Sequence, residues 1–217
     1  MLYFPPVTGL REPFNGLSHL LGSYLSLAGM IYLVQQTWDQ PSKRLSLAIY
    51  GASLTVMMVS SSAYHSLNRI AEHVRRLRAI DHAAIFVLIA GTATPIAYNL
   101  FDGFYREPYL MINWGIALVG MIYKIFFRDD SDWFIVSVYF AAGWMSLLGL
   151  PEFVRVLPFP AIAWLFAGGL IYSIGAILSA FKKPDFFPGV FGHHEVWHLS
   201  VAAAALCHYY VIVKYVL

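Results

Sequence analysis

The sequence predicts an all-α integral membrane protein, a bundle of seven transmembrane helices with a cytosolic N-terminus and an external C-terminus. Of its 217 residues, 59% are hydrophobic and only 12% are charged, which is about half the charged fraction of a soluble domain. The apolar residues come in runs of roughly 20, the length of a helix that crosses a bilayer. The connections between these runs are short, so residues 1–217 are expected to form one domain without a linker.

Seven apolar segments are expected to form the spans. They cover residues 17–36, 46–67, 79–100, 108–127, 133–150, 159–181 and 194–215. Glycines such as Gly22 and Gly168 would allow neighbouring helices to approach closely. The N-terminal residues Met1–Phe14 contain no basic stretch leading into an apolar core, so no cleavable signal peptide is expected.

Lys and Arg residues predict the orientation, because short cytosolic loops carry an excess of them. With seven spans, the N-terminus shares one side with the loops after spans two, four and six. That side holds nine basic residues: Arg11, Arg69, Arg75, Arg76, Arg78, Lys124, Arg128, Lys182 and Lys183. The other side holds five: Lys43, Arg44, Arg106, Arg155 and Lys214. The N-terminus is therefore expected in the cytosol.

Composition also excludes some classes of function. The net charge of +2 is too small to indicate a nucleic-acid partner. The single cysteine, Cys207, excludes an intrachain disulfide and lies within an apolar run, where it is expected to behave as a small buried hydrophobe.

Ionisable residues converge at the cytosolic ends of four spans. His65 ends the second span, Asp81 begins the third, and His194-Glu195-x-x-His198 begins the seventh, while spans five and six carry no charge or histidine. Ionisable groups within membrane segments are costly and usually face the bundle interior or a water-filled cavity. The shared depth of these groups therefore indicates a functional site near the inner leaflet.

Three of these residues are candidate zinc ligands. His194 and His198 are four residues apart, which places them on one helix face a single turn apart. With His65 they form a set of three histidines, the pattern of a catalytic zinc whose fourth position is open. The alternative is that each histidine caps a helix or meets lipid headgroups. Their convergence, with Asp81 nearby, favours the metal.

Other polar residues have more open interpretations. Ser61 lies four residues before His65 and could hydrogen-bond Asp81, a water or a substrate carbonyl, or its own helix backbone. Glu12, Asn15 and His19 would share one face of the first helix. They could support the metal ligands, and His19 could compete as a ligand, or the group could be an interfacial capping cluster. His82, His193 and His208 are expected to be packing or interfacial residues.

The motifs Ser61-x-x-x-His65, Asp81, His194-x-x-x-His198 and Glu12-x-x-Asn15-x-x-x-His19 resemble those of the progestin and adipoQ receptor family, in particular its bacterial hemolysin III branch. The resemblance covers essentially the whole chain. It implies a zinc ion held by the three histidines, with Asp81 near its bound water and Ser61 beside it. It also implies a multi-pass protein of the bacterial inner membrane. The family is similar to alkaline ceramidases, which are membrane amidohydrolases.

Four functions compete at this point. The first is a zinc-dependent hydrolase of acyl lipids, with Asp81 as general base and membrane lipids as substrates. The second is a non-enzymatic protein with structural zinc that senses or adjusts the lipid state of the membrane. Cytolysis is a third, although polar residues at one end alone offer no continuous polar lumen. The fourth is a zincin-like protease with Glu195 as base, which lacks a later acidic ligand.

Overall fold

The computed structural model describes residues 10–67, 70–127, 132–188 and 190–217, and the regular structure of this part of the chain consists of helices, with one isolated bridge between Phe187 and Phe191. The helices are α1 (Pro13–Gln36), α2 (Pro41–Ser66), α3 (Ala71–Leu100), α4 (Gly103–Phe126), α5 (Asp132–Trp144), the 3₁₀ helix η1 (Met145–Gly149), α6 (Leu150–Val156), α7 (Phe159–Ala180), α8 (His193–Val211) and the π-helical turn η2 (Ile212–Val216).

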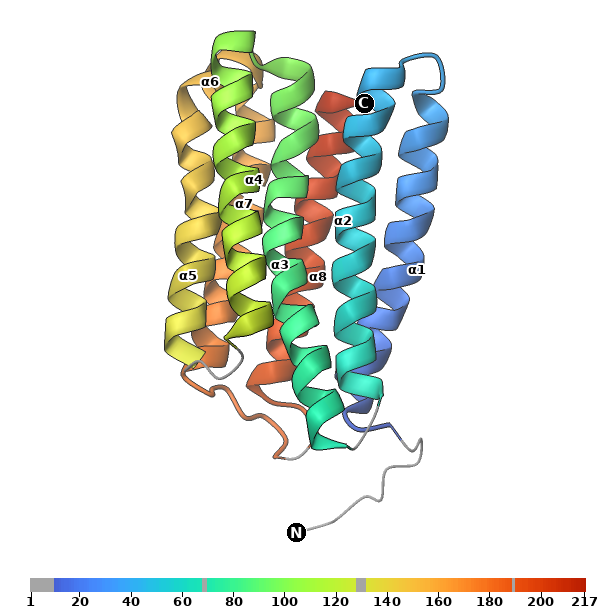
Figure 1. The fold of residues 1–217 in the computed structure, drawn as a ribbon, viewed down its shortest axis with the longest axis vertical. Coiled ribbons are helices and arrows are strands. Elements are labelled where there is room, and N and C mark those ends of the chain that lie inside the picture. Colours follow the sequence, from blue (N-terminus) through green and yellow to red (C-terminus); the bar gives the residue numbers. More distant parts are fainter. Residues whose placement is uncertain (1–9, 68–69, 128–131, 189) are drawn as a thin grey trace.

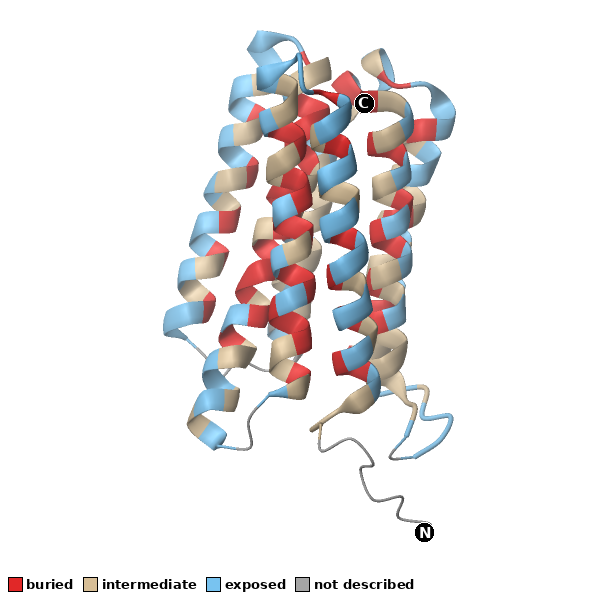
Figure 2. Cartoon of the chain, turned by 90° about the vertical axis from the view of Figure 1, so that its right-hand side faces the viewer, coloured by how far each residue is buried: buried red, intermediate tan, exposed pale blue. Residues whose placement is uncertain are grey.

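The long helices run side by side along one axis and form an elongated bundle (Figure 1). α1 begins at one end of the bundle, and the chain finishes at the other end after η2. The most extensive packing joins α1 to α2, α2 to α3, α3 to α4 and α7 to α8. Buried residues line the inward-facing sides of these helices (Figure 2). The all-α bundle expected from the sequence is confirmed for the described residues.

Small residues set how closely the central helices pack. A Cβ atom added at Gly91 of α3 would collide with the Ser53 side chain of α2. One added at Gly168 of α7 would meet the His208 ring of α8. Leu47 and Tyr50 of α2 and Leu88 of α3 are buried in the main apolar core. Glycine thus brings the helix axes together, and large side chains fill the layers between these contacts.

Six helices of the described chain are long and apolar enough to cross a membrane: α1, α2, α3, α4, α7 and α8 extended by η2. They correspond to six of the seven expected spans, and the protein is a multi-pass membrane protein. Predicted and observed ends differ mainly because helices continue into polar flanks. α3, for example, begins at Ala71 rather than 79, and Glu72 forms ion pairs with Arg75 and Arg76 at helical spacing.

The fifth expected span, residues 133–150, is not one continuous α-helix. α5 ends at Trp144, η1 follows, and α6 begins at Leu150 and reaches Val156. Pro151 explains the break, because it has no N–H to donate to the carbonyl of Leu147 in a continuous α-helix. Pro is instead accommodated in the first turn of α6. Arg69, Arg128 and residues 1–9, which entered the orientation and signal-peptide predictions, lie outside the described residues.

Candidate metal centre

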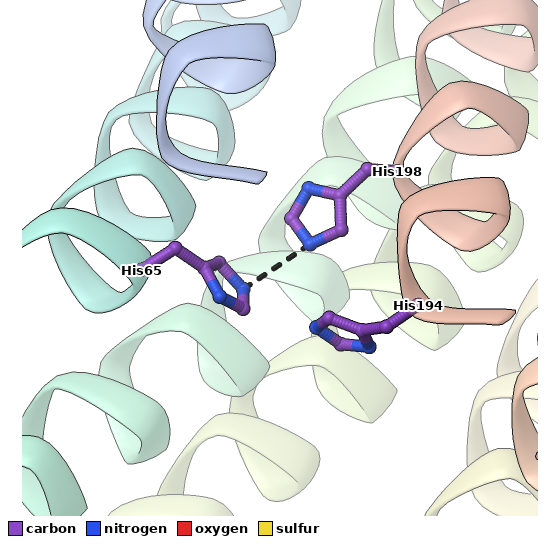
Figure 3. Close-up of side chains that lie close together, drawn as sticks. All are labelled: His65, His194 and His198. Carbon is purple, nitrogen blue, oxygen red and sulfur yellow. Dashed lines mark hydrogen bonds between the residues drawn. The ribbon is translucent and has the colours of Figure 1, made fainter. Parts of the chain in front are cut away.

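Three histidine rings from two helices point toward one another at one end of the bundle (Figure 3). His65 lies in the last turn of α2, and His194 and His198 lie in the first two turns of α8. One nitrogen of each ring lies within 4.8 Å of the others. His65 and His198 are each 2% exposed. The convergence predicted for these three residues is therefore confirmed.

The geometry of these rings fits a metal ion. Nε2 of His198 lies 3.2 Å from Nε2 of His65. Zinc bound tetrahedrally at about 2.0–2.1 Å requires ligand nitrogens roughly 3.3 Å apart. The ring centroid of His194 lies 5.0 Å from that of His65 and 4.9 Å from that of His198. The three imidazoles could thus hold one divalent cation and leave a fourth position open.

The local structure explains how α8 presents its two histidines. Gly192 precedes the helix, and its N–H donates to Oε2 of Glu195 at 2.8 Å, which is the glutamate half of a capping box, since glycine has no side chain to return the bond. This contact fixes the first turn of α8, from which His194 projects. His198 follows one turn later on the same face.

Asp81 lies on α3 and is 8% exposed. Its Oδ2 atom lies 3.6 Å from Nδ1 of His82, and the carboxylate is close enough to the His65 and His19 rings to interact with them electrostatically. The structure thus places a buried carboxylate beside the histidine cluster. Ser61, which is 3% exposed, lies on α2 one turn before His65. The catalytic roles predicted for Asp81 and Ser61 stay predictions.

The first helix contributes the third polar group of the site. Oε2 of Glu12 lies 2.6 Å from Nδ1 of His65. Partial burial raises the pKa of the Glu12 carboxyl, but the hydrogen bond to His65 and the neighbouring charges lower it, and the pKa is about 2. Glu12 is therefore ionised at neutral pH. The sequence suggested that Glu12 could support the metal ligands, and in the structure it directly contacts the candidate ligand His65.

Asn15 and His19 differ in their contacts. Nδ2 of Asn15 donates to Oε1 of Glu195 at 2.9 Å. The His19 ring centroid lies 4.1 Å from that of His198, and both ring nitrogens lack a hydrogen-bond partner within the described chain. His19 is outside the group of three nitrogens that could share one ion. It therefore lies beside the candidate metal position rather than in the set of ligands.

An apolar cavity of about 210 Å³ lies among α3, α4, α5, α7 and α8, and the sequence did not predict it. Its lining includes Leu88, Tyr172, Trp197 and His208. Trp197 directly precedes His198 in α8, although none of His65, His194 and His198 is among the described residues that line the cavity. The available signal was the glycines Gly143 and Gly169, which line the cavity and have open space where a Cβ would be.

Comparison with known proteins agrees with this architecture. The family profile described as "Haemolysin-III related" matches residues 8–209. The chain is 30% identical to "Hemolysin-3 homolog" of Bacillus subtilis over 94% of both chains. It is also 30% identical to "Hemolysin-3" of Bacillus cereus, over 95% of this chain and 92% of the relative.

More distant relatives come from animals. The chain is 26% identical to human "Monocyte to macrophage differentiation factor" over 84% of its length, and this match spans 75% of the human protein. It is 23% identical to the "Adiponectin receptor protein" of Drosophila melanogaster over 96% of its length and 54% of the receptor. The profile match over most of the chain and the two Bacillus relatives show that this protein belongs to the hemolysin III branch of the progestin and adipoQ receptor family.

Proposed function

We propose that this protein is a zinc-dependent hydrolase that cleaves an amide or ester bond of acyl lipids at the inner leaflet. The carrying observation is the convergence of three largely buried imidazoles with a buried carboxylate on another helix. An interfacial or capping role explains single histidines, but it does not require His65, His194 and His198 to aim their nitrogens at one point. A metal ion with an open coordination position does.

The residues of the chain have distinct roles in this reaction. Zinc bound to His65, His194 and His198 would supply an acidic water and polarise the scissile carbonyl. Asp81 acts as the general base that accepts the proton of the attacking water and passes it to the leaving group. Ser61 donates a hydrogen bond that orients the carbonyl oxygen. Both side chains are nearly excluded from solvent, which strengthens these polar interactions.

The apolar cavity supports an acyl substrate. Aromatic and aliphatic side chains dominate its lining, which includes Trp197, the residue before the candidate ligand His198. An acyl chain in the cavity would bury its methylene groups, and each contributes roughly 0.8 kcal/mol. Such a lipid would extend past Trp197 to bring its carbonyl to the histidine cluster. A polar or peptide substrate would gain little binding energy from this apolar lining.

A site at the inner leaflet requires the membrane orientation that the distribution of basic residues predicts. We infer that α5, η1 and α6 together complete the set of seven crossings, as the fifth crossing in chain order. The end of α4 and the start of α7 lie at opposite ends of the bundle, so the chain between them must cross it. The N-terminus and the histidine cluster then face the cytosol, and in a bacterium the host membrane is the inner membrane. A reporter fused after Leu217 should read as external. A cytosolic signal there would contradict seven crossings with this orientation.

A second candidate is a non-enzymatic lipid-sensing protein in which zinc is structural. It is favoured by the relatives whose names are those of receptors, such as the Drosophila adiponectin receptor. The deciding experiment presents purified protein in lipid vesicles with acyl-amide and acyl-ester lipids and measures released fatty acid. Release that stops on zinc chelation and resumes on zinc addition supports the hydrolase. A fully zinc-loaded protein that releases no acid from either class supports the second candidate.

A further inference from the structure

The N-terminal turn of α1 contacts both elements that carry the candidate ligands. Glu12 approaches His65 at the end of α2, and Asn15 approaches Glu195 at the start of α8. His65 lies 53 positions after Glu12 in the chain, and Glu195 lies 180 positions after Asn15. A capping cluster would serve α1 alone, whereas these contacts connect α1 to the rest of the site.

The contact with His65 is made by both backbone and side chain. The Glu12 N–H donates to the carbonyl of His65 at 3.0 Å. The Glu12 carboxylate accepts from Nδ1 of the same residue at 2.6 Å. A carboxylate that accepts this proton holds it on Nδ1, which leaves the lone pair on Nε2. Nε2 is the atom that faces His198 at 3.2 Å.

The contact with α8 uses the other acidic residue. Oε1 of Glu195 accepts from Asn15 at 2.9 Å, and Oε2 accepts from the Gly192 N–H at 2.8 Å. Both oxygens therefore have partners that fix the start of α8. Asn15 is 1% exposed and also lies 3.4 Å from Glu12. One amide thus couples the carboxylates beside the two ligand-bearing helices.

Close packing brings this turn of α1 into reach. A Cβ atom at Gly16 would collide with the Ser66 side chain of α2. The carbonyl of Gly16 accepts from the Ser62 hydroxyl at 2.9 Å. Since Ser62 and Ser66 flank His65 on α2, α1 touches this helix on both sides of the candidate ligand.

We propose that Glu12 is the positioning residue of the metal centre: it fixes the tautomer and orientation of His65, while Asn15, through Glu195, aligns the ligands of α8 with it. This inference rests on the zinc site of the proposed function. It assigns Glu195 a structural role and makes α1 part of the site although it supplies no ligand. Carboxylates that bond the far nitrogen of a metal-bound histidine typically change metal affinity 10- to 100-fold.

The first test measures zinc affinity of the purified full chain by competition with a chromophoric chelator. Glu12→Ala should weaken binding about 10- to 100-fold, and Glu12→Gln should weaken it less because an amide oxygen still accepts the proton. Glu72→Gln is the matched control, since Glu72 pairs with arginines at the start of α3, and it should leave affinity unchanged. Unchanged affinity in Glu12→Ala would overturn the proposal.

The second test reads the imidazole itself in metal-free protein. Nitrogen-15 NMR of labelled histidines, with the His65 signal identified by its loss in His65→Ala, should show the Nδ1–H tautomer in the wild type. Glu12→Ala should shift this signal toward a mixture, whereas a purely structural role would leave it unchanged and overturn the proposal. A wild type that binds no zinc yet shows the Glu12-dependent tautomer would reject the proposed function and retain the orientation of His65 by Glu12.

Discussion

The two parts of α8 place histidines in very different surroundings. At its start, His194 and His198 face His65 of α2, and the contacts of Glu195 fix the turn that carries them. Further along, His208 lines the apolar cavity, and its Nε2 lies 3.2 Å from the carbonyl of Leu165. Both regions hold imidazoles within a membrane-spanning helix. In the first, other helices add imidazole and carboxylate groups, while in the second the neighbours are mostly apolar.

This difference shows that burial of a histidine does not by itself indicate a metal. A lone imidazole can satisfy one nitrogen with a backbone carbonyl, as His208 does. Three imidazoles whose nitrogens converge compete for the same space and need a shared partner, which a cation provides. The predictions below test the contrast between the polar start of α8 and the apolar cavity further along it, from the largest expected effect to the smallest.

The largest effect is expected on metal content. His65→Ala removes one of three ligands, so purified protein should lose its zinc, whereas His208→Ala should keep about one zinc per chain. Elemental analysis of the two variants beside the wild type measures this directly. Equal zinc in all three proteins would show that the metal, if bound, is not held by the histidine cluster.

The second prediction separates the proton chemistry from metal binding. Asp81→Ala should retain zinc, because the candidate ligands are His65, His194 and His198, and Asp81 is not one of them. It should reduce lipid hydrolysis by about 10²- to 10⁴-fold, the usual contribution of a general base. Zinc content and fatty-acid release are measured on the same sample. A variant that loses zinc together with activity would make Asp81 a ligand or a structural residue instead.

Much of the polar site could be predicted from sequence because the relevant spacing is local. The His194–His198 pair follows from one helical turn, and depth along a span follows from the rise of an α-helix. These two rules are enough to place His65, Asp81 and His198 at one end of the bundle. They do not show which side chains touch, so support of the ligands by Glu12 was one of two open interpretations, and its bond to His65 was not predicted.

The cavity and the broken fifth span were harder to predict because both depend on tertiary structure. The cavity is the space left among five helices, and its glycines, Gly143 and Gly169, equally suit close helix packing. The break after Trp144 depends on Pro151, seven residues later, which was placed beyond the expected end of that span. The apolar composition of 133–150 therefore predicted a span but not its interruption.

The third prediction concerns the apolar end. Gly169→Leu adds a side chain where the structure has open space, within the cavity lining, so the protein should fold and bind zinc normally. Hydrolysis of long acyl chains should fall several-fold more than that of short ones. Gly115→Leu, at an exposed position with similar open space, is the matched control. Equal loss for both chain lengths would argue against an acyl chain in the cavity.

The smallest effect on catalysis is expected at Glu195, and it distinguishes the lipid hydrolase from a zincin-like protease. Both carboxylate oxygens of Glu195 already have partners, the Gly192 N–H and the Asn15 amide. Glu195→Ala removes this hydrogen bond at the start of α8 and should destabilise the protein by about 0.5–2 kcal/mol, as the loss of a helix cap does. Glu195→Gln can still cap the helix, so its thermal midpoint should lie between those of Glu195→Ala and the wild type.

Activity then decides between the two roles of Glu195. If it is structural, Glu195→Gln should retain most of the lipid hydrolysis at temperatures where the variant is folded, because Asp81 still accepts the proton. If it is the general base, the same variant should lose activity as completely as Asp81→Ala is expected to, since an amide cannot take up a proton at neutral pH. Glu195→Gln removes the carboxylate but keeps an oxygen that can accept the Gly192 N–H, so it tests proton transfer alone. Glu195→Ala removes both functions and cannot distinguish them.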